Sequence, residues 1–267
     1  MKTAPAKPAP EKPPASAQAA VPRVPWHPWW GVLFVLLTFY ISQLFGGLLI
    51  SVYPWLKGWS SARATDWLNN AVTAQFAFVL LAESLAIGAV YLFLKRRNLS
   101  LKIIGLRRPH WLDLGYGMAA VPPYYVLYFL TVGVVSSLVH SLNVNQQQQI
   151  GFNNVQGGGQ LLMTFISLVV LPPLAEEILV RGFLYSSLKK AMPTIWAVLL
   201  TSGLFAAAHL PEGGAAGPLY IAALDTFVLS LVLIYLREKT GSLWASITLH
   251  AFKNGIAFTA LFALHAR

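Results

Sequence analysis

Seven long apolar stretches run through this chain, and they constrain its fold more than any other feature. They cover residues 30–53, 71–94, 113–140, 160–189, 194–210, 218–236 and 242–265. A helix needs about 20 predominantly apolar residues to cross the hydrocarbon core of a bilayer. The sequence therefore predicts an all-α, polytopic membrane helical bundle with seven transmembrane helices, or eight if a further short helix also spans.

The composition excludes the main alternatives to a membrane protein. Charged residues make up 10% of the chain, against roughly 25% in a soluble domain, and hydrophobic residues make up 56%. A chain this hydrophobic is not disordered over its whole length. The absence of cysteine excludes disulfides, thiol chemistry and a cysteine-ligated zinc site. The net charge is +10, and the basic residues cluster between the apolar stretches, as they do in the loops of membrane proteins. We therefore do not expect nucleic acid as a partner.

Two regions differ in composition. Residues 1–25 are rich in proline, alanine and lysine and contain no apolar run, so we expect a flexible, extended tail and no cleaved signal peptide. Residues 26–267 form the transmembrane helical domain. Tryptophans at 26, 29 and 30 precede its first apolar stretch, where such side chains mark a membrane interface. Pro122-Pro123 and Pro172-Pro173 are expected to kink or break the third and fourth spans.

The basic residues predict the orientation of the chain. They gather before the first span, in the 95–111 loop, after the fourth span and after the sixth, whereas the 141–159 and 211–217 loops contain no lysine or arginine. A seven-span arrangement with a cytoplasmic N-terminus places every basic cluster on one side, leaving out only Lys57, Arg63 and Arg267. We therefore expect a multi-pass protein of the cell (inner) membrane, with the bilayer as a partner.

Ionisable groups inside apolar spans are costly and mark candidate functional sites. The first is Glu176-Glu177 with Arg181, since Glu177 and Arg181 are four residues apart and share one helix face. Arg181 is expected to neutralise one carboxylate and leave the other free as a general base. The alternative is a structural ion cluster between helices.

Two further polar groups lie in the later spans. His209 follows Phe205 by four residues, and His250 precedes Asn254 by four on one helix face. Taken alone, His209 is better explained as a packing residue with one hydrogen bond, whereas His250 with Asn254 is equally well explained by hydrogen bonds between helices. Two other buried acids, Glu83 and Asp225, are better explained as helix–helix hydrogen-bonding groups.

The depths of these residues agree. At 1.5 Å per residue, Glu176 lies roughly 20 Å, His209 roughly 22 Å, His250 roughly 14 Å and Asn254 roughly 20 Å from the basic end of its span. Three separate helices thus place polar groups at a similar depth. This predicts one shared site within the membrane.

The residue types at this site suit hydrolysis. A glutamate and a histidine can polarise a water molecule, while a second histidine and an amide can stabilise an oxyanion. Glu176, His209 and His250 are also candidate ligands for Zn²⁺, with a position left for water. The residue types do not decide between direct activation of the water and activation assisted by a metal ion. The sequence lacks HExxH, GxGD and GxSxG motifs.

The three motifs in this order resemble the CPBP family, which comprises type II CAAX prenyl endopeptidases and bacteriocin-processing relatives, also called the Abi family. The stretch LPPLAEEILVRGFLYSSL carries the resemblance further around the first motif, and the likeness covers about residues 160–260. It implies an all-helical intramembrane endopeptidase acting on a peptide or membrane-protein substrate. It also implies roles for the motif residues: Glu176 as base, His209 as helper in water activation, His250 and Asn254 as oxyanion pocket, and Glu177, Arg181 and Phe205 as support.

Two functions of other classes remain. One is a non-proteolytic membrane scaffold, regulator or immunity protein on the same fold. The other is a transporter that uses the buried acids as a proton relay. If the chain is a protease, the kinked fourth span and the basic rim are the expected route of the substrate.

Overall fold

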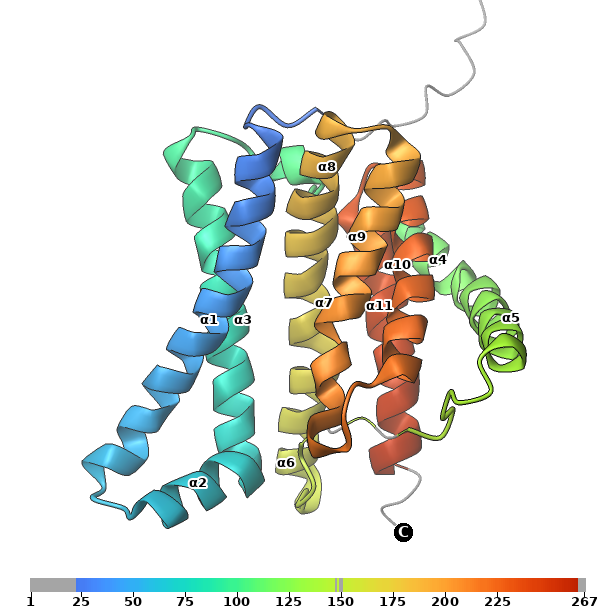
Figure 1. Ribbon diagram of the computed structural model, residues 1–267. Helices are drawn as coiled ribbons and strands as arrows, with labels where there is room; N and C mark the ends of the chain where they lie inside the picture. Colours follow the sequence, from blue (N-terminus) through green and yellow to red (C-terminus); the bar gives the residue numbers. More distant parts are fainter. Residues whose placement is uncertain (1–22, 147, 149–150, 264–267) are drawn as a thin grey trace, which may run out of the picture.

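A long, unevenly wound helical rod forms the centre of the molecule, and the other helices pack on its two sides (Figure 1). The computed structural model describes residues 23–146, 148 and 151–263. Helices α1 (Pro28–Leu56) and α3 (Val72–Arg96) pair on one side of the rod, joined by the short α2 (Ser61–Asn70). Helices α9 (Thr194–Ala208), α10 (Tyr220–Thr240) and α11 (Leu243–Phe258) lie on the other.

The central rod is the fourth predicted span, Gly157–Ala191. It consists of α6 (Gly157–Phe165), the π-helical η2 (Ile166–Val170), α7 (Leu171–Glu176), the π-helical η3 (Glu177–Leu184) and α8 (Tyr185–Ala191). The expected break at Pro172-Pro173 does not occur, because the helix continues through the two prolines with a π-helical turn on each side of them. All eight residues of η3 are buried, so the first motif lies in the middle of the bundle.

Within the described part of the chain, six helical segments are long and apolar enough to cross a membrane: Pro28–Leu56, Val72–Arg96, Trp111–Leu138, Gly157–Ala191, Thr194–Gly214 and Tyr220–Thr240. The chain is thus an all-helical, multi-pass membrane protein. The predicted count of seven or eight is not confirmed. The seventh predicted span, 242–265, contains an α-helix of 16 residues, α11, followed by the π-helical η5 (Thr259–Ala263), and its last two positions lie outside the described residues. Helix α2 has ten residues and is too short to span.

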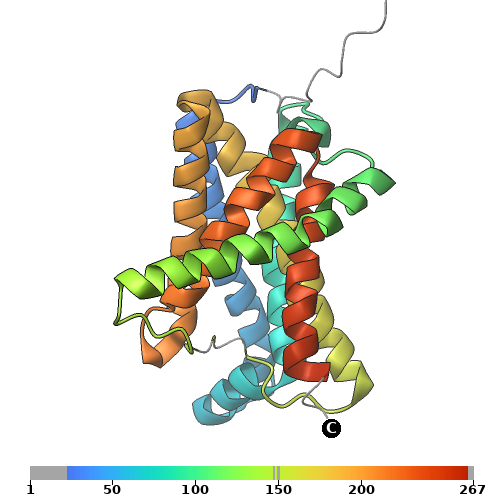
Figure 2. The ribbon, with the colours of Figure 1, turned by 90° about the vertical axis from the view of Figure 1, so that its right-hand side faces the viewer.

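The third span is divided at Ala120 into α4 (Trp111–Ala119) and α5 (Val121–Leu138), next to Pro122-Pro123 as expected. Both helices run obliquely across the bundle (Figure 2). Helix α5 touches α10 through Tyr124, while Phe129 and Leu130 are exposed. An exposed apolar face on a spanning helix is suited to contact with lipid.

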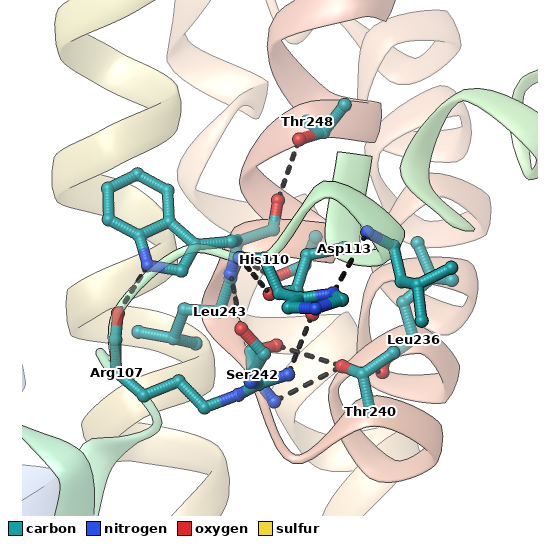
Figure 3. Close-up of polar contacts among 11 residues, drawn as sticks. Arg107, His110, Asp113, Leu236, Thr240, Ser242, Leu243 and Thr248 are labelled. Carbon is teal, nitrogen blue, oxygen red and sulfur yellow. Dashed lines mark hydrogen bonds and ion pairs between the residues drawn. The ribbon is translucent and has the colours of Figure 1, made fainter. Parts of the chain in front are cut away.

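A polar network fixes one end of α11 and α4 (Figure 3). The connection after η1 (Leu101–Ile104) supplies two carbonyl acceptors: Gly105 O accepts from Leu243 N at 2.9 Å, and Arg107 O accepts from Trp244 Nε1 at 2.6 Å. Asp113 pairs with Arg107 at 2.8 Å and accepts from the His110 backbone N at 3.0 Å, which caps α4. These bonds set the position of α11 along its axis.

The start of the described chain is packed, not free. Residues 1–22 of the predicted tail lie outside the described residues, but Val24 within it is buried. Trp26 is also buried, stacks on Phe183 at 4.6 Å and donates to Ser187 Oγ at 2.9 Å. Trp26 is therefore a core side chain, whereas Trp29 and Trp30 are exposed as the interface prediction requires.

The basic connections gather at one end of the molecule. The segments after α3, between α8 and α9, and between α10 and α11 lie together at the top of Figure 1, and α2, α6 and η4 (Leu210–Ala216) lie at the opposite end. This agrees with the clustering seen in the sequence. The cytoplasmic placement of that end stays a prediction.

Candidate active site

A cavity of about 290 Å³ lies between α3, the central rod, η4, α10 and α11. Three of the four predicted catalytic residues line it: Glu176 from α7, His209 from the end of α9, and Asn254 from α11. The fourth, His250, is buried directly behind, with its Nε2 3.7 Å from Glu176 Oε2. The structure thus brings the three motifs together.

The first motif divides its two carboxylates as the spacing indicated. Glu177 Oε1 accepts a hydrogen bond from Arg181 Nη1 at 2.8 Å, and both side chains are fully buried. His250 Nδ1 lies 3.1 Å from the same oxygen. Because a carboxylate only accepts, Nδ1 of His250 carries the hydrogen of this bond. Glu177 is therefore held by two partners from two helices.

Glu176 has a different environment from its neighbour. Its side chain is 23% exposed and faces the cavity. Its Oε2 makes no hydrogen bond with the described residues. A carboxylate oxygen in an enclosed space without a donor retains its capacity to accept a proton. Glu176 is thus the free carboxylate of the pair.

Arg181 and Phe205 form the layer behind the cavity. The Arg181 guanidinium carbon lies 4.3 Å from the centre of the Phe205 ring, and that ring meets His209 edge to face at 4.8 Å. A guanidinium over an aromatic face is stabilised by the ring's quadrupole. These residues thus connect the Glu177 ion pair with His209 and do not themselves line the cavity.

His209 is oriented by its own helix. Its Nδ1 donates to the Phe205 carbonyl at 2.8 Å, since that oxygen can only accept. The Nε2 atom then carries the lone pair, and it lies 3.8 Å from Glu212 Oε1. Sequence reasoning missed Glu212, although its spacing of three from His209 indicated a shared face. Both side chains line the cavity.

Asn254 bonds to a backbone carbonyl that Pro172 and Pro173 leave without its helical donor. Its Nδ2 donates to the Leu168 carbonyl at 2.9 Å. In an α-helix that carbonyl would accept from residue 172, and in a π-helix from residue 173. Both are prolines and have no N–H. The Asn254 amide therefore replaces the missing backbone donor and joins α11 to the rod.

Three further charged residues line the same cavity. Lys253 Nζ lies 2.8 Å from Asp225 Oδ2, and the Tyr124 hydroxyl donates to Asp225 Oδ1. Lys253 shares the cavity with His209 and Asn254. Glu83, interpreted as a helix–helix hydrogen-bonding group, also lines the cavity.

The candidate zinc ligands do not form a metal-binding arrangement. Among residues 23–146, 148 and 151–263, no three histidine, aspartate or glutamate side chains are grouped so that they could hold a metal ion. Glu176, His209 and His250 thus do not form a zinc site as they lie.

The cavity lies toward the end of the molecule opposite the basic connections. Its lining includes Gln148 and Phe152 from the segment before α6, Glu212 from η4, and Leu261 and Phe262 from η5. No residue of the three basic connections lines it. The expected substrate route through the basic rim is therefore not the one this cavity offers.

Comparison with known proteins gives one match. Residues 158–256 match the model of the family described as type II CAAX prenyl endopeptidase Rce1-like. The matched segment runs from α6 through most of α11 and contains all seven motif residues, and it is consistent with the CPBP resemblance. No curated protein and no solved structure gives a significant match.

Proposed function

We propose that this protein is an intramembrane endopeptidase. The premise is that residues 158–256 form an Rce1-like domain of a membrane-embedded CAAX protease family. The protein hydrolyses a peptide bond in a membrane-associated or lipid-proximal substrate. The observation that carries the proposal is the Glu176 carboxylate, which lines the cavity and whose buried Oε2 has no hydrogen-bond partner among the described residues. A scaffold or regulator has no need for an unpaired carboxylate in a cavity lined by other ionisable groups.

Glu176 is the general base of the proposed reaction. It takes a proton from a water molecule as the water oxygen bonds to the peptide carbonyl carbon, and the carbonyl oxygen becomes an oxyanion. Glu176 then gives the proton to the leaving nitrogen as the C–N bond breaks, which yields a carboxylic acid and an amine. Positioned proton transfer of this kind contributes roughly 10²–10⁴-fold to a rate.

The neighbouring side chains have separate roles. His209 presents the lone pair of Nε2 to the cavity and orients the water. Asn254 offers its amide to the oxyanion. His250 donates from Nε2 only as the doubly protonated ring, because its Nδ1 hydrogen is used for Glu177. Glu177 and Arg181 neutralise each other and leave the single negative charge on Glu176.

The cavity lining fits an apolar substrate residue beside a polar backbone. Phe78, Val79 and Phe258 line it together with the charged groups. A peptide segment within or at the surface of the bilayer offers such side chains. The lipid bilayer is thus both the environment of the enzyme and the location of its substrate.

Cleavage by the purified protein tests the proposal. The assay uses the full chain in detergent with a library of hydrophobic and lipidated peptides. Glu176→Gln and His209→Ala are expected to abolish cleavage. Glu238→Gln is the matched control, because Glu238 binds Lys189 at the opposite end of the molecule. Cleavage that persists in Glu176→Gln contradicts the proposal, and full complementation of a deletion strain by that variant favours the scaffold function.

The proposed orientation, with a cytoplasmic N-terminus, has its own test. The chain contains no cysteine, so single cysteines report on position without further changes. Lys102→Cys lies in η1 at the basic end, and Gln156→Cys lies at the start of α6 at the other. A membrane-impermeant maleimide applied to intact cells is expected to label the second and spare the first. The reverse pattern contradicts the orientation.

A further inference from the structure

A second and larger hollow adjoins the catalytic cavity. It is a cleft of about 950 Å³ at the end of the molecule opposite the basic connections. Its walls come from the end of α2, the start of α3, the chain around the end of η4, and six residues of the stretch before α6: Asn143, Asn145, Gln146, Gln148, Gly151 and Asn153. The cleft is within the volume range of ligand sites, roughly 300–1,000 Å³.

The chemistry of this cleft is unusual for a surface. Eight of the side chains that line it are asparagine or glutamine, and none is charged. Each amide side chain offers both N–H donors and a carbonyl acceptor and has no net charge. A peptide unit has the same groups. The lining is thus complementary to an extended, uncharged peptide backbone.

Some of these amides build the walls. Gln75 accepts from the Phe152 backbone N at 2.7 Å and donates to the Asn69 carbonyl, so it ties the segment before α6 to the end of α2. Gln146 donates to the Pro218 carbonyl at 3.1 Å and accepts from Ile221 N at 3.4 Å. The walls are therefore positioned by bonds that do not depend on a ligand.

Other amides are uncommitted. The side chains of Asn69, Asn145 and Asn153 make no hydrogen bond with another residue of the described chain, and all three are exposed to the cleft. Their donors and acceptors are available to a bound molecule. A fixed frame with free hydrogen-bonding groups on two facing segments, the end of α2 and the stretch before α6, is the arrangement of a preformed binding site.

The cleft and the catalytic cavity adjoin each other, since Gln148 lines both of them. Its Nε2 donates to Glu212 Oε2 at 2.6 Å, and Glu212 lies beside His209 in the catalytic cavity. A peptide held in the cleft therefore lies next to the catalytic groups.

We propose that this cleft binds the uncharged polar segment of the peptide substrate that adjoins the scissile bond. The segment lies extended, advancing about 3.3 Å per residue, and its backbone bonds to Asn69, Asn145 and Asn153. The cleft then selects substrates with a polar, uncharged flank emerging from the membrane on the side away from the basic connections. This inference rests on the proposed protease function and names its substrate class.

Binding to the full-length Glu176→Gln protein in lipid nanodiscs tests the inference without cleavage. The probes are two fluorescent peptides with the same apolar segment, one carrying a flank of about six glycine, serine and asparagine residues and one without it. The flanked peptide is expected to bind more tightly. Replacing Asn69, Asn145 and Asn153 together by alanine should weaken its binding by about tenfold, the loss expected when two or more hydrogen bonds are removed, and leave the flank-free peptide unchanged.

Gln156→Ala is the matched control, since Gln156 is an exposed amide at the same end that does not line the cleft. It should leave both affinities unchanged. Equal binding of the two peptides, or an unaffected triple variant, overturns the inference. So does a soluble oligosaccharide that binds through the three asparagines when the flanked peptide does not. Flank-dependent binding with no cleavage by the parent protein would instead count against the protease function alone.

Discussion

The two ends of α11 use polar side chains in opposite ways. At its start, Ser242, Ser246 and Thr248 bond within the helix or its cap, to Trp244 N, Leu243 O and Trp244 O. In its second half, the bonds of His250, Lys253 and Asn254 go to Glu177, Asp225 and Leu168 on three other elements. The start of the helix is anchored by these local bonds and by two backbone carbonyls of one connection, those of Gly105 and Arg107. The side-chain bonds of the second half reach three other elements and assemble a site.

Both ends also contain buried polar atoms without partners, but their surroundings differ. The network of Figure 3 binds the carbonyls of Gly105 and Arg107 and both oxygens of Asp113. The nitrogens of the buried Arg237, which lies against Gly105, have no hydrogen-bond partner among the described residues. The same is true of Glu176 Oε2 and Ser167 Oγ, but these two residues line the cavity. What distinguishes the candidate active site is thus a space that a ligand can enter beside its unpaired groups.

The largest expected effect tests the functional end. Glu176→Gln should lower the cleavage rate by about 10²–10⁴-fold, because it removes the general base. The free energy of unfolding should change by less than about 0.5 kcal/mol, because no hydrogen bond is lost. Peptide cleavage and thermal unfolding in detergent measure the two quantities. A large loss of stability would mean that Glu176 is part of the frame.

Glu177→Ala should destabilise the protein by about 3–5 kcal/mol, since it leaves the fully buried Arg181 without its counter-charge. Chemical unfolding in detergent measures the loss. The double variant Glu177→Ala/Arg181→Met should regain much of it, because no unpaired charge remains. If the double variant is no more stable than the single one, the ion pair is not the cause.

Asn254→Ala should lower the free energy of unfolding by about 1–1.5 kcal/mol, because the half-buried Leu168 carbonyl loses its hydrogen-bond donor. The cause is the Leu168 oxygen, which Pro172 cannot serve. The same substitution should therefore cost less in a Pro172→Ala background, where residue 172 supplies an N–H. Unfolding of the four proteins of this cycle gives the coupling energy. An equal cost in both backgrounds would contradict the proposed replacement of the backbone donor.

The smallest effect belongs to the anchor. Asp113→Ala removes the cap of α4 and the pairing with Arg107, and should lower the free energy of unfolding by about 1 kcal/mol. Cleavage by the folded protein should be unchanged, because Asp113 lies at the other end of the bundle from the cavity. A reduced cleavage rate under conditions where the variant is fully folded would contradict the division of α11 into an anchoring end and a functional end.

The sequence was sufficient for the outline of the fold and for the grouping of the motifs. Six of the seven predicted spans correspond to spanning helical segments, and the similar depths of Glu176, His209 and His250 correspond to residues at one cavity. The chemical roles of these residues remain predictions. Spacing and hydropathy work here because ionisable groups are rare in spans, so each one carries information.

The remaining features depend on contacts that no local pattern contains. Asp225 faces Lys253 only because α10 packs against α11 at one register. The continuity of the fourth span could not be predicted either, because proline pairs usually break helices, and here π-helical turns on both sides maintain the rod. Trp26 had the sequence position of an interface residue, but the Ser187 hydroxyl and the Phe183 ring provide a buried place for it.

The bond between Asn254 and Leu168 has a consequence for which residue types position 254 tolerates. The amide nitrogen of asparagine carries two hydrogens, and one of them is taken by the Leu168 carbonyl. The second is left for whatever occupies the cavity. A serine or threonine has a single hydrogen to give, and an aspartate normally has none. Only a side chain with two hydrogens on one nitrogen can hold the rod and serve a substrate at the same moment, so the proline pair in one helix dictates the amide in another.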